Sequence, residues 1–242
     1  MGQFVTGARL RHIVLAAGAL TPEVALARSS LGLELGISDP AGMSGFDLEH
    51  EVLLLGSTYL EIVAPLGGGA SSAAARFLAR GGPGGYMLDL QVPDLGLVLE
   101  RVAQLGLTPV LRDEYRGNQI CQLHPRDFGT LLEVDQIAGS RDWHWDAEFP
   151  SSSRAVERAL PVGAVLAVPS SPLAMAERWA FVFGGTLGPD SVRLSGCSVS
   201  FVPAGDGRPG LRSVDVVVPG SRGEVEIAGV AFRLFSDAGS PS

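Results

Sequence analysis

The sequence has 242 residues, a formal net charge of −8 and 46% hydrophobic residues, which is enough for a packed core. It contains no lysine, so every basic residue is an arginine. The acidic balance argues against nucleic-acid binding, which needs a basic face, and the missing lysine excludes Walker-type phosphate loops and Schiff-base enzymes. No apolar run reaches the roughly 18 residues of a membrane span, and the N-terminus lacks a signal-peptide layout, so we expect a cytoplasmic globular protein.

The first 66 residues predict one strand, one helix and three further strands. Apolar runs indicate the strands, and Thr21-Pro22-Glu23 is typical of a helix start, with an N-cap, a proline in the first turn and an early acid. Gly32 is expected to end this helix. The strands are expected at residues 10–17, 33–37, 51–55 and 58–63.

The same order of elements returns after a stretch rich in glycine and alanine, which we interpret as a connector. Residues 86–92 predict a strand, Pro93-Asp94 starts a helix that Gly106 ends, and residues 120–135 predict a hairpin. A third copy opens at Gly163, and a fourth opens at Ser213 but has no room for a helix. The sequence therefore predicts an α+β protein of repeated βαβββ modules whose last module is truncated.

Three charged or titratable residues stand in otherwise apolar strands, namely His12, Glu61 and Glu133. A buried charge is costly unless a partner stabilises it, so these positions indicate a site. One imidazole and two carboxylates could hold Mn²⁺, Fe²⁺, Ni²⁺ or Zn²⁺. Asp89, two residues after Met87 on the same strand face, is a further oxygen donor on this reasoning.

The arrangement resembles the vicinal oxygen chelate superfamily, which includes glyoxalases, methylmalonyl-CoA epimerases, extradiol dioxygenases and metal-free antibiotic-binding proteins. The motifs that carry the resemblance lie at residues 10–15, 59–66 and 124–133. The resemblance covers residues 8–137 well and the remainder as a degenerate echo. It implies curved mixed sheets with the helices packed outside, and a small-molecule substrate or ligand.

Family positions carried onto this sequence give His12, Glu61, Met87 and Glu133 as metal ligands. Met87 departs from the pattern, because a thioether is a poor ligand for such cations. The resemblance also implies that Glu61 or Glu133 acts as a catalytic base. Met87, Asp89 and His50 are weaker candidates for the cavity wall, and an exposed loop position is the commoner alternative for His50.

Domain boundaries follow from the repeat. We predict a glyoxalase-like domain of two modules over residues 8–137, a linker over 138–161, the degenerate third and truncated fourth modules over 162–236, and a flexible tail over 237–242. The positions equivalent to Glu61 and Glu133 are Ser200 and Arg233, so the later copies lose the ligand set. Cys121 and Cys197 are expected to be reduced core residues.

Three functions remain open on the sequence alone. The first is a metal-assisted enzyme of lyase, isomerase or dioxygenase type that acts on a substrate with vicinal oxygens. The second is a metal-free small-molecule binding protein of the same fold, in which Met87 forms part of the ligand wall. The third is an interaction scaffold, in which His12 is a core histidine and the two glutamates are strand ends. We expect no nucleic-acid or membrane partner and leave a homodimer open.

Overall fold

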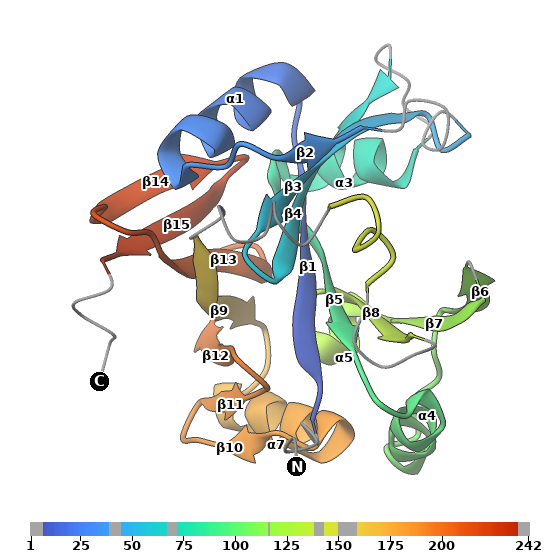
Figure 1. The fold of residues 1–242 in the computed structure, drawn as a ribbon. Coiled ribbons are helices and arrows are strands. Elements are labelled where there is room, and N and C mark those ends of the chain that lie inside the picture. The colour runs from blue at the N-terminus through green and yellow to red at the C-terminus, as the bar shows by residue number, and fades with distance from the viewer. Residues whose placement is uncertain are drawn as a thin grey trace, which may run out of the picture. The chain divides into compact units, whose positions relative to one another are not determined.

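The computed structural model describes residues 7–38, 45–66, 72–115, 117–137, 143–149 and 159–236, and the predicted tail at 237–242 lies outside them. Helices and strands alternate as the repeat predicts, and the strands form curved mixed sheets (Figure 1). No helix in the described parts of the chain is long and apolar enough to cross a bilayer.

The first two modules have the predicted order of elements, with short additions. The first contains β1 (Arg9–Ala16), α1 (Leu20–Leu31), β2 (Gly36–Ile37), β3 (Leu48–Leu55) and β4 (Thr58–Pro65), and α3 (Ala73–Gly81) follows it. The second contains β5 (Gly84–Gln91), α4 (Leu95–Gln104), β6 (Leu111–Tyr115), β7 (Asn118–Leu123), α5 (Pro125–Phe128) and β8 (Leu131–Gln136).

The third module is complete and the fourth is truncated, as predicted. The third contains β9 (Leu160–Val168), α7 (Pro172–Phe183), β10 (Thr186–Leu187), β11 (Ser191–Arg193) and β12 (Ser198–Pro203). The fourth has only β13 (Gly210–Val217), β14 (Gly223–Ile227) and β15 (Val230–Phe235). A tight turn joins β14 to β15 through Ala228 and Gly229, both with positive φ, which is the conformation that two-residue hairpins use.

All four modules share one strand register. In each, the first strand pairs in parallel with the last strand of the same module. The residues that face each other at the strand starts are His12 and Tyr59, Met87 and Leu131, Gly163 and Ser198, and Ser213 and Ala231. Two residues further along the last strands, the equivalent positions are therefore Glu61, Glu133, Ser200 and Arg233.

The chain clusters into two compact units that interleave the modules. The His12 unit comprises His12–Tyr86, Glu148–Val162 and Leu211–Ser242, and thus the first and fourth modules. The Glu133 unit comprises Met1–Arg11, Met87–Ala147 and Gly163–Gly210, and thus the second and third modules. Each unit combines modules that are not both contained in one of the predicted domains. The predicted domain boundaries at 8–137, 138–161 and 162–236 therefore stay predictions.

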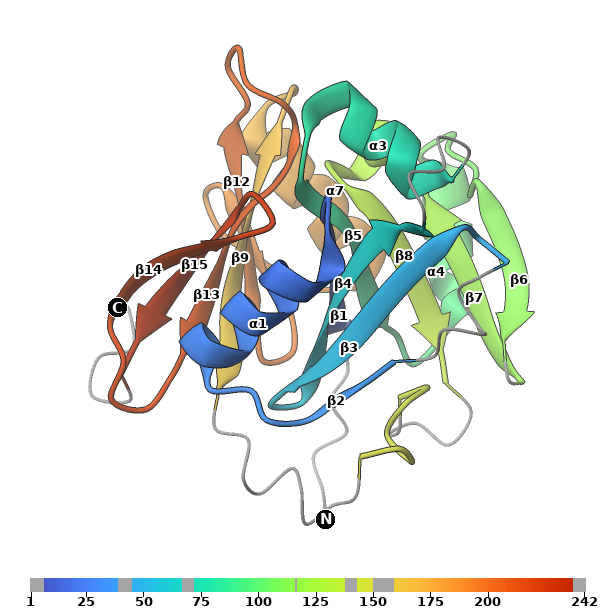
Figure 2. The same ribbon diagram turned by 90° about the horizontal axis from the view of Figure 1, so that it is seen from above.

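In the His12 unit, α1 contacts both modules. It packs on β3 and β4 of the first module and on β14 of the fourth (Figure 2). Val24, Ala27 and Leu31 form its buried stripe, and the Glu23 carboxylate accepts a hydrogen bond of 2.7 Å from the Ala228 amide. One helix therefore serves two modules, which is consistent with the fourth module having none of its own.

The Glu133 unit has a matching arrangement around α7. This helix packs on β11 and β12 and also contacts α4 and α5 of the second module. Trp179 is fully buried, and its indole Nε1 donates to the Phe128 carbonyl at 3.2 Å. Arg101 of α4 donates to the Val182 carbonyl near the end of α7 at 3.2 Å.

Three local predictions differ from the structure. The N-cap of α1 is Ala19 rather than Thr21, which lies inside the helix. The alanine-rich connector contains α3, which Ser72 caps by accepting a hydrogen bond from the Ala75 amide, because alanine favours helix where glycine does not interrupt it. The turn of the second-module hairpin is the short helix α5, with Pro125 in its first turn. The helix end at Gly32 is confirmed, and α7 likewise ends at Gly184, with both glycines in the left-handed conformation.

Candidate functional site

A buried carboxylate lies between two imidazoles on one face of the first module. Glu61 is in the middle of β4, and its Oε2 lies 3.2 Å from Nε2 of His12 on β1. On its other side, Glu61 Oε1 contacts Nδ1 of His50 on β3. All three side chains are less than a tenth exposed. We call these three residues the His–Glu–His cluster.

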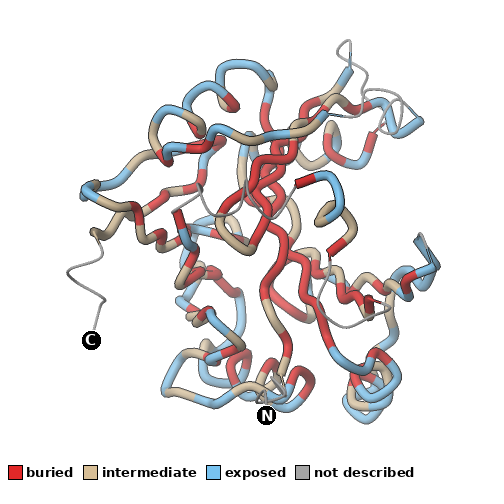
Figure 3. Tube along the Cα trace, in the orientation of Figure 1, coloured by how far each residue is buried: buried red, intermediate tan, exposed pale blue. Residues whose placement is uncertain are grey.

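The strand register explains why the three side chains meet. Val52 of β3 stands opposite Glu61, and His50 stands opposite Val63, so His50 and Glu61 project from the same face. Val14 of β1 stands opposite Glu61 in the parallel pair. His12, two residues before Val14, therefore projects from the same face of the sheet. Neighbours such as Val14, Val52 and Val63 are almost fully buried, and β1 and β4 are buried along most of their length (Figure 3).

The two imidazoles decide the charge state of Glu61. Burial alone raises the pKa of this carboxyl, but hydrogen bonds from His12 and His50, together with their charges, lower the pKa from 4.5 to about 2. The carboxylate therefore keeps its negative charge at neutral pH although it is buried among apolar side chains. A carboxylate of this kind suits a permanent ligand or electrostatic partner better than a base that must take up a proton near neutrality.

Glu133 occupies the equivalent position of the second module, in a more polar setting. Its Oε2 accepts a hydrogen bond of 2.7 Å from Nε2 of Gln122 on the neighbouring β7. Asp89 of β5 stands directly opposite Glu133, and only 2% of its surface is exposed. Met87 precedes Asp89 by two residues and shares its face.

The structure thus brings some predicted site residues together within each unit. His12, His50 and Glu61 meet in the His12 unit, whereas Met87, Asp89 and Glu133 share one strand face of the Glu133 unit. His50 lies inside β3 and is 9% exposed, so the alternative of an exposed loop position is wrong. The meeting of Glu133 with His12 and Glu61 stays a prediction.

The donor atoms of the cluster suit a borderline cation, but in the structure both imidazoles contact the Glu61 carboxylate. Two imidazoles and one carboxylate match Mn²⁺, Fe²⁺, Ni²⁺ or Zn²⁺ in chemical type. Among the residues that the structure describes, no three His, Cys, Asp or Glu side chains are arranged to hold a metal ion. Metal binding by His12 and Glu61 would therefore require the contact between His12 Nε2 and Glu61 Oε2 to open.

Sequence reasoning missed a second buried histidine–carboxylate pair. His144 Nε2 lies 2.6 Å from Asp135 Oδ2 at the end of β8, and its Nδ1 lies 3.3 Å from the side-chain amide of Asn118 on β7. The rings of Trp143 and Tyr115 pack edge-on against His144. One signal was available, since Asp135 follows Glu133 by two residues and so shares its strand face; the contact with His144 was not predictable, because it is tertiary.

The cysteines take no part in the site. Both are free and buried, as predicted. Burial raises the pKa of Cys121 to about 12, and the negative charges of Asp135 and Glu133 add to the shift. Cys121 therefore remains a neutral thiol and is neither a nucleophile nor a metal ligand at neutral pH.

No family model matches this sequence, and no curated protein matches it. A solved structure of a mutant 4-hydroxymandelate synthase from Streptomyces coelicolor is similar to this chain, with a TM-score of 0.65 and 16% sequence identity. The match covers 88% of this chain and 72% of that chain. The chain has the vicinal oxygen chelate fold. This vicinal oxygen chelate likeness spans both halves of the sequence, so the third and fourth copies are modules of the same fold.

Two shorter proteins are similar to about half of the chain. Methylmalonyl-CoA epimerase from Mycobacterium tuberculosis is 24% identical, and the match covers 57% of this chain and 93% of that chain, with a TM-score of 0.46. A hypothetical protein from Bacillus halodurans is 23% identical, and the match covers 56% of this chain and 99% of that chain, with a TM-score of 0.47.

Proposed function

We propose that this protein is a glyoxalase-like enzyme that acts on a small molecule with two adjacent oxygen atoms and is assisted by a divalent metal ion. The observation that carries the proposal is the His–Glu–His cluster, in which an ionised carboxylate is buried between two imidazoles on an apolar sheet face. Keeping such a charge inside a protein is costly, and perturbed carboxylates of this kind concentrate at functional sites.

In this proposal His12, Glu61 and Glu133 hold the metal ion. A bound divalent ion would supply Lewis-acid stabilisation of a developing oxygen anion on the substrate. Glu61 contributes a fixed negative charge, because its pKa of about 2 keeps it ionised at neutral pH. His50 orients Glu61 through the contact at Oε1, while Oε2 faces His12.

Glu133 is the better candidate for moving a proton. It stands in a polar neighbourhood, where Gln122 holds one carboxylate oxygen and Asp89 lies opposite on β5. Released from the metal ion and from the neutral Gln122 amide, the Glu133 carboxylate would accept a proton from a carbon next to a carbonyl group. Lyase, isomerase and dioxygenase reactions of the glyoxalase-like type all begin with substrate held by two vicinal oxygens, so the reaction class stays open.

Elemental analysis of protein purified without added metal tests this proposal. We expect close to one equivalent of Mn, Fe, Ni or Zn in the wild type and a loss of at least tenfold in Glu61→Gln, which keeps the shape but removes the charge. Glu226→Gln is the matched control, since Glu226 is exposed on β14 of the same unit. A wild-type content below about a tenth of an equivalent, with no binding on titration, would contradict the proposal.

A metal-free binding protein is the second candidate, and two observations favour it. The imidazoles of His12 and His50 already contact the two oxygens of the Glu61 carboxylate, and Met87 occupies a family ligand position. Under this alternative the same face holds an apolar or aromatic molecule. Thermal-shift measurements with a panel of ligands separate the two candidates. Stabilisation by a ligand without any response to Mn²⁺ or Zn²⁺ would favour the metal-free binding protein over the metal-assisted enzyme.

A further inference from the structure

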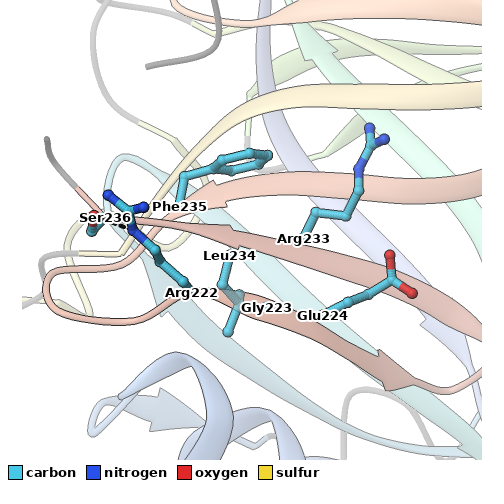
Figure 4. A pocket seen from close by; sticks show the side chains of 7 residues that line it. All are labelled: Arg222, Gly223, Glu224, Arg233, Leu234, Phe235 and Ser236. Carbon is cyan, nitrogen blue, oxygen red and sulfur yellow. Dashed lines mark hydrogen bonds between the residues drawn. The ribbon is translucent and has the colours of Figure 1, made fainter. Parts of the chain in front are cut away.

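A hollow of about 420 Å³ lies on the fourth module, apart from the residues of the His–Glu–His cluster. Residues of β14, of β15 and of their immediate flanks line it (Figure 4). These are Arg222, Gly223, Glu224, Arg233, Leu234, Phe235 and Ser236. Its volume falls within the range of small-molecule sites.

The residue of the fourth module that is equivalent to Glu61 and Glu133 carries the opposite charge. Arg233 stands two residues after Ala231, which faces Ser213, and the same count in the first two modules reaches Glu61 and Glu133. The fourth module therefore presents a guanidinium where the first two modules present a carboxylate. A position that suits a cation in the first two modules suits an anion here.

Two arginine side chains line this hollow, and each has N–H groups besides its Nε–H that can bind a ligand. Arg233 donates through Nε to Asp215 Oδ1 at 2.6 Å, and Arg222 donates through Nε to Ser236 Oγ at 3.0 Å. Each contact fixes a side chain through Nε, while the two terminal nitrogens of each arginine carry further N–H groups. A guanidinium held in this way is suited to planar, bidentate recognition of a carboxylate.

The hollow also has an apolar wall. Phe235 follows Arg233 by two residues and projects from the same side of β15 (Figure 4). An aromatic ring next to a guanidinium matches a ligand that combines a negative group with an apolar body. Glu224 stands opposite Arg233 across the hairpin, which disfavours ligands with two or more negative charges.

We propose that the fourth module binds a small organic monoanion, a carboxylate joined to an aromatic or apolar body, with Arg233 as its principal contact. Arg222 and Phe235 complete the site, and Asp215 orients the Arg233 guanidinium. This binding site shares no residue with the proposed enzymatic site, so it goes beyond the proposed function and stands independently of it.

Calorimetric titration of the full-length protein with benzoate tests the proposal. We expect wild-type binding with a dissociation constant in the range of about 1 mM or below, which suits a small ligand with one ion pair and one ring contact. Acetate lacks the ring and benzyl alcohol lacks the charge, so each should bind at least tenfold more weakly. Equal binding of acetate and benzoate, or no benzoate binding to the wild type, would overturn the proposal.

Variants locate the site. Arg233→Gln should weaken benzoate binding at least tenfold, whereas Arg212→Gln, on the opposite face of β13, should leave it unchanged. Circular dichroism melts verify that each variant folds, and Arg233→Lys provides a charge-preserving second variant that should bind at an intermediate level.

The outcome is separable from that of the metal experiment. Benzoate binding should persist in Glu61→Gln and in protein treated with a chelator, because neither change touches the fourth module. Loss of benzoate binding in Glu61→Gln, or unchanged binding in Arg233→Gln, would assign the anion site elsewhere and contradict the inference.

Discussion

The first and fourth modules share one register but differ in what that register presents. In the first, Glu61 is buried between two histidines, and in the fourth, Arg233 pairs with Asp215 on a face where the arginine side chain is 40% exposed. The backbone fixes the position of this side chain, while its burial and its neighbouring residues determine its interactions and its contribution to the free energy of unfolding. The fold thus supplies equivalent positions, and substitution at those positions supplies different chemistry.

The largest effect should follow from removing the carboxylate of the first module. Glu61→Ala leaves two buried imidazoles without their partner and should lower the free energy of unfolding by about 3–5 kcal/mol. The equivalent ion pair of the fourth module is partly exposed, so Arg233→Ala should cost below about 1 kcal/mol. Urea denaturation monitored by circular dichroism measures both; equal losses would show that the two positions do not differ in energetic weight.

Acid titration of stability should separate the wild type from Glu61→Gln. The folded pKa of Glu61 is about 2, below its ordinary value of 4.5, so its contribution is present above pH 4.5 and is lost as the pH falls toward 2. The advantage of the wild type over Glu61→Gln should therefore shrink across this window by on the order of 3 kcal/mol. Denaturation curves collected between pH 2 and pH 7 report it, and a gap that does not change with pH would contradict the buried ionised state.

A smaller effect is expected at His50. His50→Ala removes one of the two imidazoles that contact Glu61 and should cost about 1.5–3 kcal/mol, the worth of a hydrogen bond to a charged group. Glu224→Ala, at an exposed position of the fourth module, is the contrasting variant and should stay within about 0.5 kcal/mol of the wild type. A neutral result at His50 would mean that His12 alone supports the carboxylate.

The smallest effect should come from Asp215. Asp215→Asn keeps the shape of the side chain and weakens only a partly exposed ion pair, so thermal unfolding should shift by the equivalent of about 0.5 kcal/mol or less. A loss as large as that of Glu61→Ala would show that the fourth module depends on its ion pair as the first depends on its cluster.

The sequence predicted the modules because their patterns are local. Apolar strands, the glycine stop at Gly32 and the recurring strand starts revealed the repeat and the equivalence of Glu61 with Arg233. The placement of His50 was harder, because β3 begins at Leu48 in a stretch where charged and apolar residues alternate and the sequence pattern indicated a later start. His144 lies outside any regular element, so its contact with Asp135 depends on tertiary folding that no periodicity records.

The pairing of modules was also beyond the sequence. Each module has the same internal pattern, so nothing local specifies that the first clusters with the fourth and the second with the third. Among the described residues, α1 contacts β14 of the fourth module, and the Ala228 amide donates a hydrogen bond to Glu23. Such contacts between distant segments depend on surface complementarity and not on periodicity.

Calorimetric titration of metal-free protein with Mn²⁺ and Zn²⁺ asks whether His12, Glu61 and Glu133 bind one metal ion, with the wild type compared against His12→Ala, Glu61→Gln and Glu133→Gln. We expect one site per chain in the wild type and at least tenfold weaker binding in each of the three variants, because each removes one donor. Binding that is absent in the wild type, or that survives unchanged in Glu61→Gln, would contradict it.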